Sequence, residues 1–285
     1  NLRCGYCYLS AGDDVQEVGL STREICSLLR DVYKLKPQKV VFTGGEPLLR
    51  DDLVEIASFF KSLDKENMVR LCINSNGTLI NSENAVSLTK VFDEIRISID
   101  GFEETNGKLR GQGSFKKAMN AFRAVLRAGG DPVAFITVTS INVSMIKDFM
   151  SFLLCEGISH IHFSQINLTG RALGKSELAC DIEEVTKTVA EFWYENFGLK
   201  LEDRTNANSI NCGVGRFITV FPDGSVYPCH LLAFPEFCVG NVRENSLYSI
   251  FHHSHVLNKF RGLDFCRMAN QDEYKATVVL MVSDT

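Results

Sequence analysis

Through the first two thirds of the chain, stretches with apolar side chains at helical spacing alternate with short, continuous apolar runs. Residues 21–35 illustrate the first kind: Ser21 and Glu24 form a capping-box pattern, and Pro37 follows the last apolar position. The same spacing predicts helices at residues 52–63, 81–91, 114–128 and 145–154. The intervening runs predict strands at residues 39–42, 69–74, 94–99, 133–139 and 160–166. Strands and helices that alternate at such short intervals predict a parallel sheet covered by helices.

The last third of the chain has a different pattern. Residues 174–197 predict a long acidic helix, and the polar stretch at residues 203–211 is a reasonable domain boundary. Two short apolar runs, at residues 217–221 and 226–228, flank Pro-Asp-Gly-Ser and predict a β-hairpin. Residues 269–285 match no motif, and we assign no element to them.

Composition and charge narrow the class of protein. The chain has 285 residues, of which 45% are hydrophobic and 23% are charged, enough for one large α/β domain and a smaller one. A net charge of −5 without a basic face argues against a non-specific nucleic-acid binder. Because no apolar run reaches the length that crosses a bilayer, we expect no membrane partner.

The ten cysteines form two clusters and a scattered set. Four lie in apolar or helical surroundings, and we expect them to be buried structural thiols: Cys26, Cys72, Cys155 and Cys180. The other six gather near the two ends of the chain, with a spacing unlike that of a secreted disulfide framework. Clustered thiols favour a reducing interior, so we expect a cytoplasmic protein.

Two short motifs carry the chemistry. Cys4 and Cys7 lie three positions apart in the opening Asn-Leu-Arg-Cys-Gly-Tyr-Cys-Tyr. A C-x-x-C pair by itself serves zinc sites, redox dithiols and iron–sulfur clusters. The second motif, Thr-Gly-Gly-Glu-Pro, directly follows the strand predicted at residues 39–42. Its glycines let the backbone approach a ligand closely, although Gly-Gly and Pro also make an ordinary strand-ending turn.

The opening segment closely resembles the cluster loop of the radical S-adenosylmethionine (radical SAM) superfamily, C-x-x-x-C-x-aromatic-C, and Gly-Gly-Glu-Pro matches its GGEP motif. Cys4 and Cys7 correspond to the second and third cysteines of the loop, so we expect a Cys directly before Asn1. The resemblance implies a partial (β/α)6 barrel, here with its first strand missing. It also implies a [4Fe–4S] cluster on three thiolates, whose open iron binds S-adenosylmethionine (SAM) and cleaves it to a 5′-deoxyadenosyl radical. An electron donor such as flavodoxin or ferredoxin would reduce the cluster.

The same resemblance assigns SAM contacts to individual residues. Gly44, Gly45 and Glu46 would hold the SAM amino group. Four further positions match polar strand ends that contact the ribose and the methionine carboxylate: Asn74, Asn76, Ser98 and Asp100. Tyr6 resembles the aromatic residue beside the adenine, and Arg110 resembles a residue near the carboxylate, where a guanidinium can make a forked contact. Ordinary turns, caps and sheet-end hydrogen bonds stay open as alternatives for the strand-end positions.

A second resemblance lies toward the C-terminal end. Cys212, Gly224 and Cys229 match the opening of the SPASM extension, which holds one or two auxiliary [4Fe–4S] clusters in relatives. Cys266 fits the first cysteine of the next family motif, but its partner position is Ala269. We therefore expect either one auxiliary cluster or leftover thiols without a cluster. The thiols available to such a cluster are Cys212, Cys229, Cys238 and Cys266.

Together, these resemblances divide the chain into a radical SAM core (1–172), a linker helix and loop (173–205), an incomplete SPASM-like hairpin domain (206–268) and an atypical tail (269–285). They imply an enzyme that modifies a peptide or protein substrate. His230 occupies the place of a proton-accepting carboxylate in protein-maturing relatives, although a polar contact at the hairpin end is the simpler role. Two alternative functions stay open: small-molecule cofactor or haem biosynthesis, and a degenerate, non-catalytic iron–sulfur or binding protein.

Overall fold

The computed structural model describes residues 1–12, 19–197, 217–261 and 277–283. The chain forms two compact units, each made of several segments. The first consists of Asn1–Gly12, Ser75–Val86 and Ile95–Asn206, and the second of Asp13–Asn74, Ser87–Glu94 and Ala207–Thr285. Parallel strands and helices occur in both units, which confirms the predicted α/β class.

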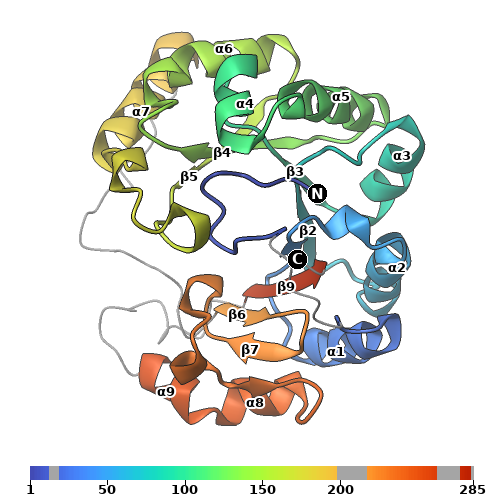
Figure 1. Ribbon diagram of the computed structural model, residues 1–285. Helices are drawn as coiled ribbons and strands as arrows, with labels where there is room; N and C mark the ends of the chain where they lie inside the picture. Colours follow the sequence, from blue (N-terminus) through green and yellow to red (C-terminus); the bar gives the residue numbers. More distant parts are fainter. Residues whose placement is uncertain (13–18, 198–216, 262–276, 284–285) are drawn as a thin grey trace. The chain divides into compact units, whose positions relative to one another are not determined.

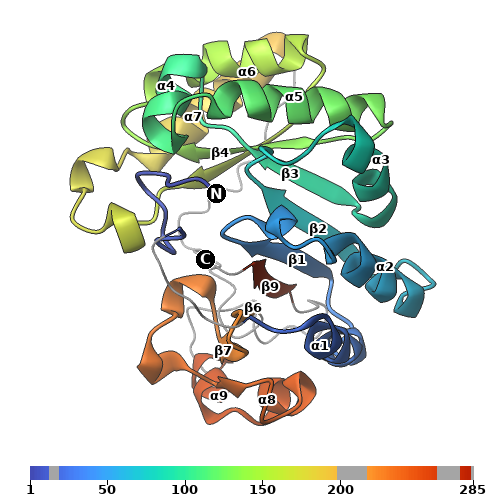
Figure 2. The same ribbon diagram turned by 45° about the vertical axis from the view of Figure 1, so that its right-hand side comes forward.

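In the first unit, β3 (Glu94–Ser98), β4 (Val133–Val138) and β5 (His160–Gln165) run parallel to one another. Four helices accompany these strands: α4 (Glu103–Arg110), α5 (Ser114–Arg127), α6 (Ile146–Cys155) and α7 (Ile182–Phe197). Helices α4, α5 and α6 lie along the same side of β4 in both views (Figures 1 and 2). The amphipathic pattern of α5 places its apolar face inward, with Ala118, Phe122 and Val125 buried.

In the second unit, β1 (Lys39–Gly44) and β2 (Arg70–Ser75) are parallel, with Phe42 opposite Ile73. Helices α1 (Thr22–Lys34) and α2 (Leu53–Leu63) pack against each other. The predicted capping box at the start of α1 is confirmed, because the Ser21 N–H donates to Glu24 Oε2 at 2.8 Å and the Glu24 N–H donates to Ser21 Oγ at 3.3 Å. Helix α3 (Ser82–Val91) contributes residues to both units.

The predicted hairpin is also present in the second unit. Strands β6 (Phe217–Val220) and β7 (Ser225–Tyr227) pair antiparallel, and the two-residue β8 (Gly240–Asn241) pairs with β7. Gly224, at the turn, has a φ of +87°, and a Cβ there would lie 2.6 Å from Asn241 Oδ1. The turn therefore requires glycine on two counts. Helices α8 (Leu247–His253) and α9 (His255–Arg261) follow.

The C-terminal segment supplies a strand that the sequence analysis did not assign. Strand β9 (Thr277–Ser283) pairs in parallel with β1, Val279 opposite Val41, and with β6, Val278 opposite Ile218. Figure 1 shows β9 beside β6 near the C-terminus. Residues 278–281 are buried. The run Thr-Val-Val-Leu-Met-Val has the β-branched, apolar composition of a strand covered on both faces, and this signal was available from the sequence.

Three other features of the structure differ from the sequence analysis. The predicted helix at 174–197 begins only at Ile182, because the Asp181 carboxylate accepts from the Glu183 N–H at 2.8 Å and starts the helix there. Residues 103–110 form α4, which the apolar spacing did not mark. Among the four cysteines expected to be buried, only Cys72 is; Cys155 is exposed, and Cys26 and Cys180 are partly exposed.

In the part of the chain that the structure describes, no helix is both long enough and apolar enough for a membrane crossing.

Candidate functional site

The cluster loop, residues 1–12, presents both cysteines of the C-x-x-C motif. The Cys7 N–H donates to the Cys4 carbonyl at 3.2 Å, and this turn brings the two residues close together. Both are free, partly exposed thiols. The Gly5 N–H donates to the Leu109 carbonyl at 3.0 Å and ties the loop to the end of α4. Burial raises the pKa of the Cys4 thiol, and the Arg110 guanidinium opposes this increase.

Three of the predicted SAM-binding residues form one buried network. The Tyr6 hydroxyl donates to Asp100 Oδ2 at 2.5 Å, and Arg110 donates to both Asp100 oxygens, from Nε at 2.6 Å and from Nη2 at 2.9 Å. The Thr137 N–H also donates to Asp100 Oδ1, at 2.9 Å. Burial raises the pKa of Tyr6 well above its usual value. Burial also opposes the charge on Arg110, but the Asp100 carboxylate outweighs that effect and raises the Arg110 pKa.

Two buried asparagines that the sequence analysis missed hold Asp100 in place. Asn106 Oδ1 accepts from the Asp100 N–H at 2.8 Å, and Asn142 Nδ2 donates to the Asp100 carbonyl at 2.8 Å. Asn106 lies on α4, which the apolar spacing did not mark, and Asn142 lies in the loop after β4. Their only sequence signal is a polar side chain in a segment that follows a strand, which most such segments share.

Two other strand-end predictions, Asn76 and Ser98, also lie in the first unit. Asn76 Oδ1 accepts from the Thr78 N–H at 2.9 Å, and Asn76 Nδ2 donates to Asn1 Oδ1 at 2.8 Å. Asn76 therefore shapes a turn and also fastens the start of the cluster loop. Ser98 is the last residue of β3 and is partly exposed. SAM contacts by Asn76, Ser98 and Asp100 stay predictions.

In the second unit, the GGEP motif lies at the carboxyl end of β1. Gly44 has a φ of +141°, a backbone conformation that glycine adopts easily and other residues rarely adopt. Both Gly44 and Gly45 are partly exposed. The Glu46 side chain is fully buried, and its Oε1 accepts from the Leu48 N–H at 3.3 Å. Asn74 follows Ile73, which pairs with Phe42, so Asn74 lies at the same end of the neighbouring strand. Its Oδ1 is buried and has no hydrogen-bond partner among the described residues.

These residues fit the cofactors that the resemblance implies. Free thiols in a C-x-x-C turn are the ligands that iron–sulfur clusters use. A buried carboxylate and an unsatisfied amide oxygen at adjoining strand ends favour a ligand with hydrogen-bond donors, such as an ammonium group. Gly44 and Gly45 leave the backbone accessible at the same edge.

The auxiliary-cluster residues are described only in part. Cys229 Sγ lies 3.9 Å from Nδ1 of His230, and Cys238 Sγ lies 3.6 Å from the Gly240 carbonyl oxygen. Burial lowers the pKa of His230, which favours the neutral imidazole. Cys212 and Cys266 fall outside the described residues. Within the described ranges, no three His, Cys, Asp or Glu side chains are gathered as metal ligands.

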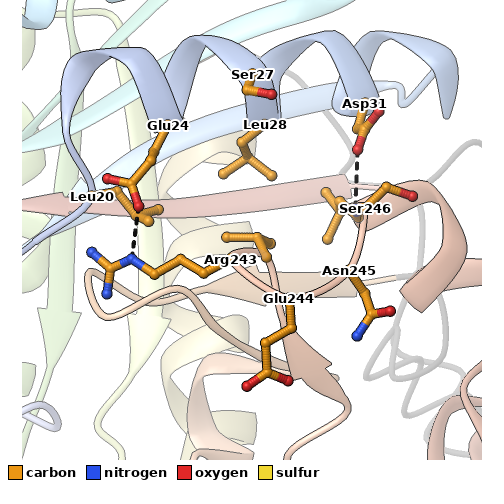
Figure 3. Close-up of a pocket in the computed structure, with 11 residues that line it drawn as sticks. Leu20, Glu24, Ser27, Leu28, Asp31, Arg243, Glu244, Asn245 and Ser246 are labelled. Atoms are coloured by element: carbon orange, nitrogen blue, oxygen red, sulfur yellow. Dashed lines mark hydrogen bonds and ion pairs between the residues drawn. The ribbon is translucent and has the colours of Figure 1, made fainter.

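A separate hollow of about 500 Å³ lies between α1 and residues 242–247, and its lining includes none of the predicted site residues. Figure 3 shows Glu24 and Asp31 reaching from α1 toward this segment. Arg243 Nε donates to Glu24 Oε1 at 2.7 Å, and the Leu247 N–H donates to Asp31 Oδ2 at 3.2 Å. These side chains join α1 to the segment before α8, so they have a structural role in the second unit.

Comparison with known proteins identifies the family. The profile of the radical SAM superfamily matches residues 1–153, and that of the SPASM iron–sulfur cluster-binding domain matches residues 212–276. Fe-coproporphyrin III synthase of Methanosarcina barkeri is 33% identical over 66% of this chain and 47% of its own length. The chain likewise spans only 42% of the pre-heme d1 synthase of Dinoroseobacter shibae, at 30% identity. PqqA peptide cyclase of Gluconobacter oxydans is 27% identical over 95% of this chain and 80% of its own.

Solved structures agree on the fold. Native anSMEcpe with bound AdoMet aligns with a TM-score of 0.74 at 21% identity, over 95% of this chain and 80% of that one. Streptococcus suis SuiB bound to precursor peptide SuiA aligns with a TM-score of 0.74 at 14% identity, over 92% of this chain and 64% of that one. Because the superfamily profile covers more than half of the sequence, the chain belongs to the radical SAM superfamily, whose cofactors are a [4Fe–4S] cluster and SAM.

Proposed function

We propose that this protein is a radical SAM enzyme in which Cys4 and Cys7, with a third thiolate, hold the [4Fe–4S] cluster. Gly44, Gly45 and Glu46 bind the SAM amino group. When bound, the cluster would supply the one electron that cleaves SAM to a 5′-deoxyadenosyl radical. Residues 1–172 form the core, 173–205 the linker and 206–268 the SPASM-like region, while residues 277–283 of the tail add β9 to the sheet.

The observation that carries the proposal is the pair of buried acceptors at adjoining strand ends. Glu46 is fully buried at the end of β1, and Asn74 Oδ1 is buried without a partner at the end of β2. A buried acceptor left unsatisfied costs about 1–3 kcal/mol, which a donating ligand would recover. An ammonium group carries three donors and a positive charge, so it suits both the amide oxygen and the carboxylate.

The further SAM contacts that we propose in the first unit belong to residues of the network around Asp100. Tyr6, Asp100 and Arg110 fix one another through charge-assisted hydrogen bonds. Side chains that already hold one another in place lower the ordering cost of binding a ligand. Contacts of SAM with Tyr6, Arg110 and the strand-end residues Asn76 and Ser98 belong to this proposal, as does a proton-accepting role for His230.

The substrate that we propose is a peptide or protein, with flavodoxin or ferredoxin as electron donor. PqqA peptide cyclase and mycofactocin maturase MftC of Mycolicibacterium smegmatis match over more than nine tenths of this chain. A haem-related small molecule is the second candidate, because Fe-coproporphyrin III synthase shows the higher identity, 33%. A short peptide gene beside this one would favour the first candidate, and porphyrin genes would favour the second.

Anaerobic reconstitution of the full reading frame, followed by measurement of iron and of 5′-deoxyadenosine, tests the proposal. The wild-type protein should contain about four irons at the SAM site and release 5′-deoxyadenosine. Cys4→Ala should abolish both. Cys155→Ser, which changes an exposed cysteine outside both motifs, should change neither. Zinc, or no metal, in the wild-type loop would refute the proposal.

A further inference from the structure

The segment after β5 binds the backbone of the cluster loop at four points within the first unit. The Arg171 N–H donates to the Cys7 carbonyl at 2.9 Å, Arg171 Nε to the Cys4 carbonyl at 2.9 Å, and Nη2 to the Ala11 carbonyl at 2.8 Å. The Lys175 ammonium donates to the Gly5 carbonyl at 2.8 Å. Two cationic side chains therefore hold the backbone around both thiols.

Gly170 brings the two segments into direct contact. Its φ is +56°, and a Cβ at this position would lie 2.5 Å from the Cys7 carbonyl oxygen and closer still to that of Tyr8. Glycine is therefore required for the approach that lets Arg171 reach the loop.

The shape of the loop depends on these contacts. Residues 1–12 form no helix or strand. The Gly5 carbonyl accepts from Lys175 and the Ala11 carbonyl from Arg171, whereas the Cys4 carbonyl accepts from both Arg171 and the Cys7 N–H. Residues that hydrogen-bond to the ligands of a metal site orient those ligands, and replacing such residues typically costs about 10–100-fold in metal affinity.

The same contacts place positive charge on the backbone of the cluster loop around the two cysteines. Arg171 and Lys175 bind the carbonyls of Cys4 and of its neighbour Gly5, and among the described residues no carboxylate lies within ion-pair distance of Lys175. The reduction potential of an iron–sulfur cluster depends on local charge and hydrogen bonding. Reduction adds one electron, and a nearby cation stabilises the added negative charge.

We propose that Arg171 and Lys175 are positioning residues for the cluster. Arg171 fixes the backbone that spaces Cys4 and Cys7, and the two cations together make the bound cluster easier to reduce. This inference rests on the proposed function, because it requires a [4Fe–4S] cluster at Cys4 and Cys7.

Four variants of the anaerobically reconstituted, full-length protein separate shape from charge. Arg171→Lys keeps the charge but loses the forked donors, Arg171→Met loses both, and Lys175→Met removes the second cation. Lys116→Met removes an exposed cation on α5 and is the matched control. The readouts are iron per chain, the rate of cluster loss to a chelator, and the midpoint potential from an EPR-monitored titration.

Arg171→Lys should lose its cluster about tenfold faster with little change in potential. Lys175→Met should lower the reduced-to-oxidised ratio at a fixed potential about tenfold, equivalent to ~59 mV for a one-electron couple. Arg171→Met should show both effects, and Lys116→Met neither.

The outcomes distinguish the inference from the proposed function. A wild-type protein that binds no iron would refute the proposed function. A wild-type protein with a cluster, whose Arg171 and Lys175 variants match it in chelation rate and potential, would refute only the inference. Circular dichroism melting of the apo proteins checks that each variant folds; if Arg171→Met does not, Arg171→Lys and Lys175→Met still decide.

Discussion

At the scale of single residues, the Asp100–Arg110 pair is buried on both sides, with side-chain exposures of 0% and 8%. Arg110→Met leaves the carboxylate without its cation, and we expect the free energy of unfolding to fall by about 3–5 kcal/mol. Urea unfolding measures the loss. Lys108→Met, which breaks an exposed ion pair with Glu104 on the same helix, should leave the transition where it is. Equal transitions for the two variants would contradict the importance of the buried pair.

Gly170 and Gly174 offer a second matched test, because both have positive φ angles, +56° and +78°. Alanine is strained by the backbone at either position. Only at Gly170 would the Cβ also collide with carbonyl groups of the cluster loop, whereas nothing lies within 4 Å at Gly174. Gly170→Ala should therefore be less stable than Gly174→Ala by about 1–3 kcal/mol, the usual cost of overpacking. Thermal or urea unfolding would show whether the order is reversed.

What the sequence revealed about single residues depended on how local their role is. The contacts of Asn76 with Thr78 fit the turn that Asn-Gly suggested, because a side chain that binds two residues ahead leaves a local pattern. Asn106 and Asn142 bind Asp100 from six and 42 positions away. Such contacts depend on the completed fold, so no short pattern identifies them.

At the scale of elements, the start of α1 is linked to the segment before α8 through Glu24. Hydrogen bonds from Ser21, and then from Arg243, lower the pKa of Glu24 from 4.5 to about 2. Because the folded-state pKa is the lower one, the carboxylate stabilises the fold fully above about pH 4.5 and loses this effect as the pH falls toward 2. The side chain is 39% exposed, so solvent screening limits the effect to under about 1 kcal/mol.

Glu24→Gln should therefore lose less stability than the wild type between about pH 5 and about pH 3. The loss of stability of Arg243→Met over the same pH range should lie between those of Glu24→Gln and the wild type, because the hydrogen bonds from Ser21 to Glu24 remain. Urea unfolding at both pH values gives the comparison. A Glu24→Gln variant with the same pH dependence as the wild type would show that this carboxylate has no part in it.

Helices and strands were predictable where apolar side chains recur at a regular spacing along the chain. The amphipathic helices and the apolar strands fall close to their predicted ranges because burial on one face or on both leaves a clear pattern. Helix α4 is short and rich in polar residues, and it buries Thr105 and Asn106 through tertiary contacts rather than an apolar stripe. Sequence periodicity therefore could not mark it.

At the scale of the whole chain, the motifs identified the family and both cofactors. The residue types of the cluster loop and of GGEP are set by the binding of those cofactors, so a short pattern is enough to recognise them. The role of the tail was missed for the opposite reason. The position of a strand such as β9 is set by pairing with strands that are distant in sequence. Val279 pairs with Val41 and Val278 with Ile218, and only the fold brings these residues together.

Strand β9 makes parallel ladders on both of its edges, with β1 and with β6, so it joins the GGEP strand to the SPASM-like hairpin within the second unit. Val279→Pro removes a backbone donor in the middle of the strand and imposes a ring that a central strand does not accommodate. We expect earlier unfolding in urea and faster hydrogen exchange at amides 40–42 and 218–220, since both ladders lose their shared partner. Val279→Ile keeps the donor and the β-branched shape and should exchange at wild-type rates. Unchanged protection of both β1 and β6 in Val279→Pro would mean that β9 does not hold these strands together.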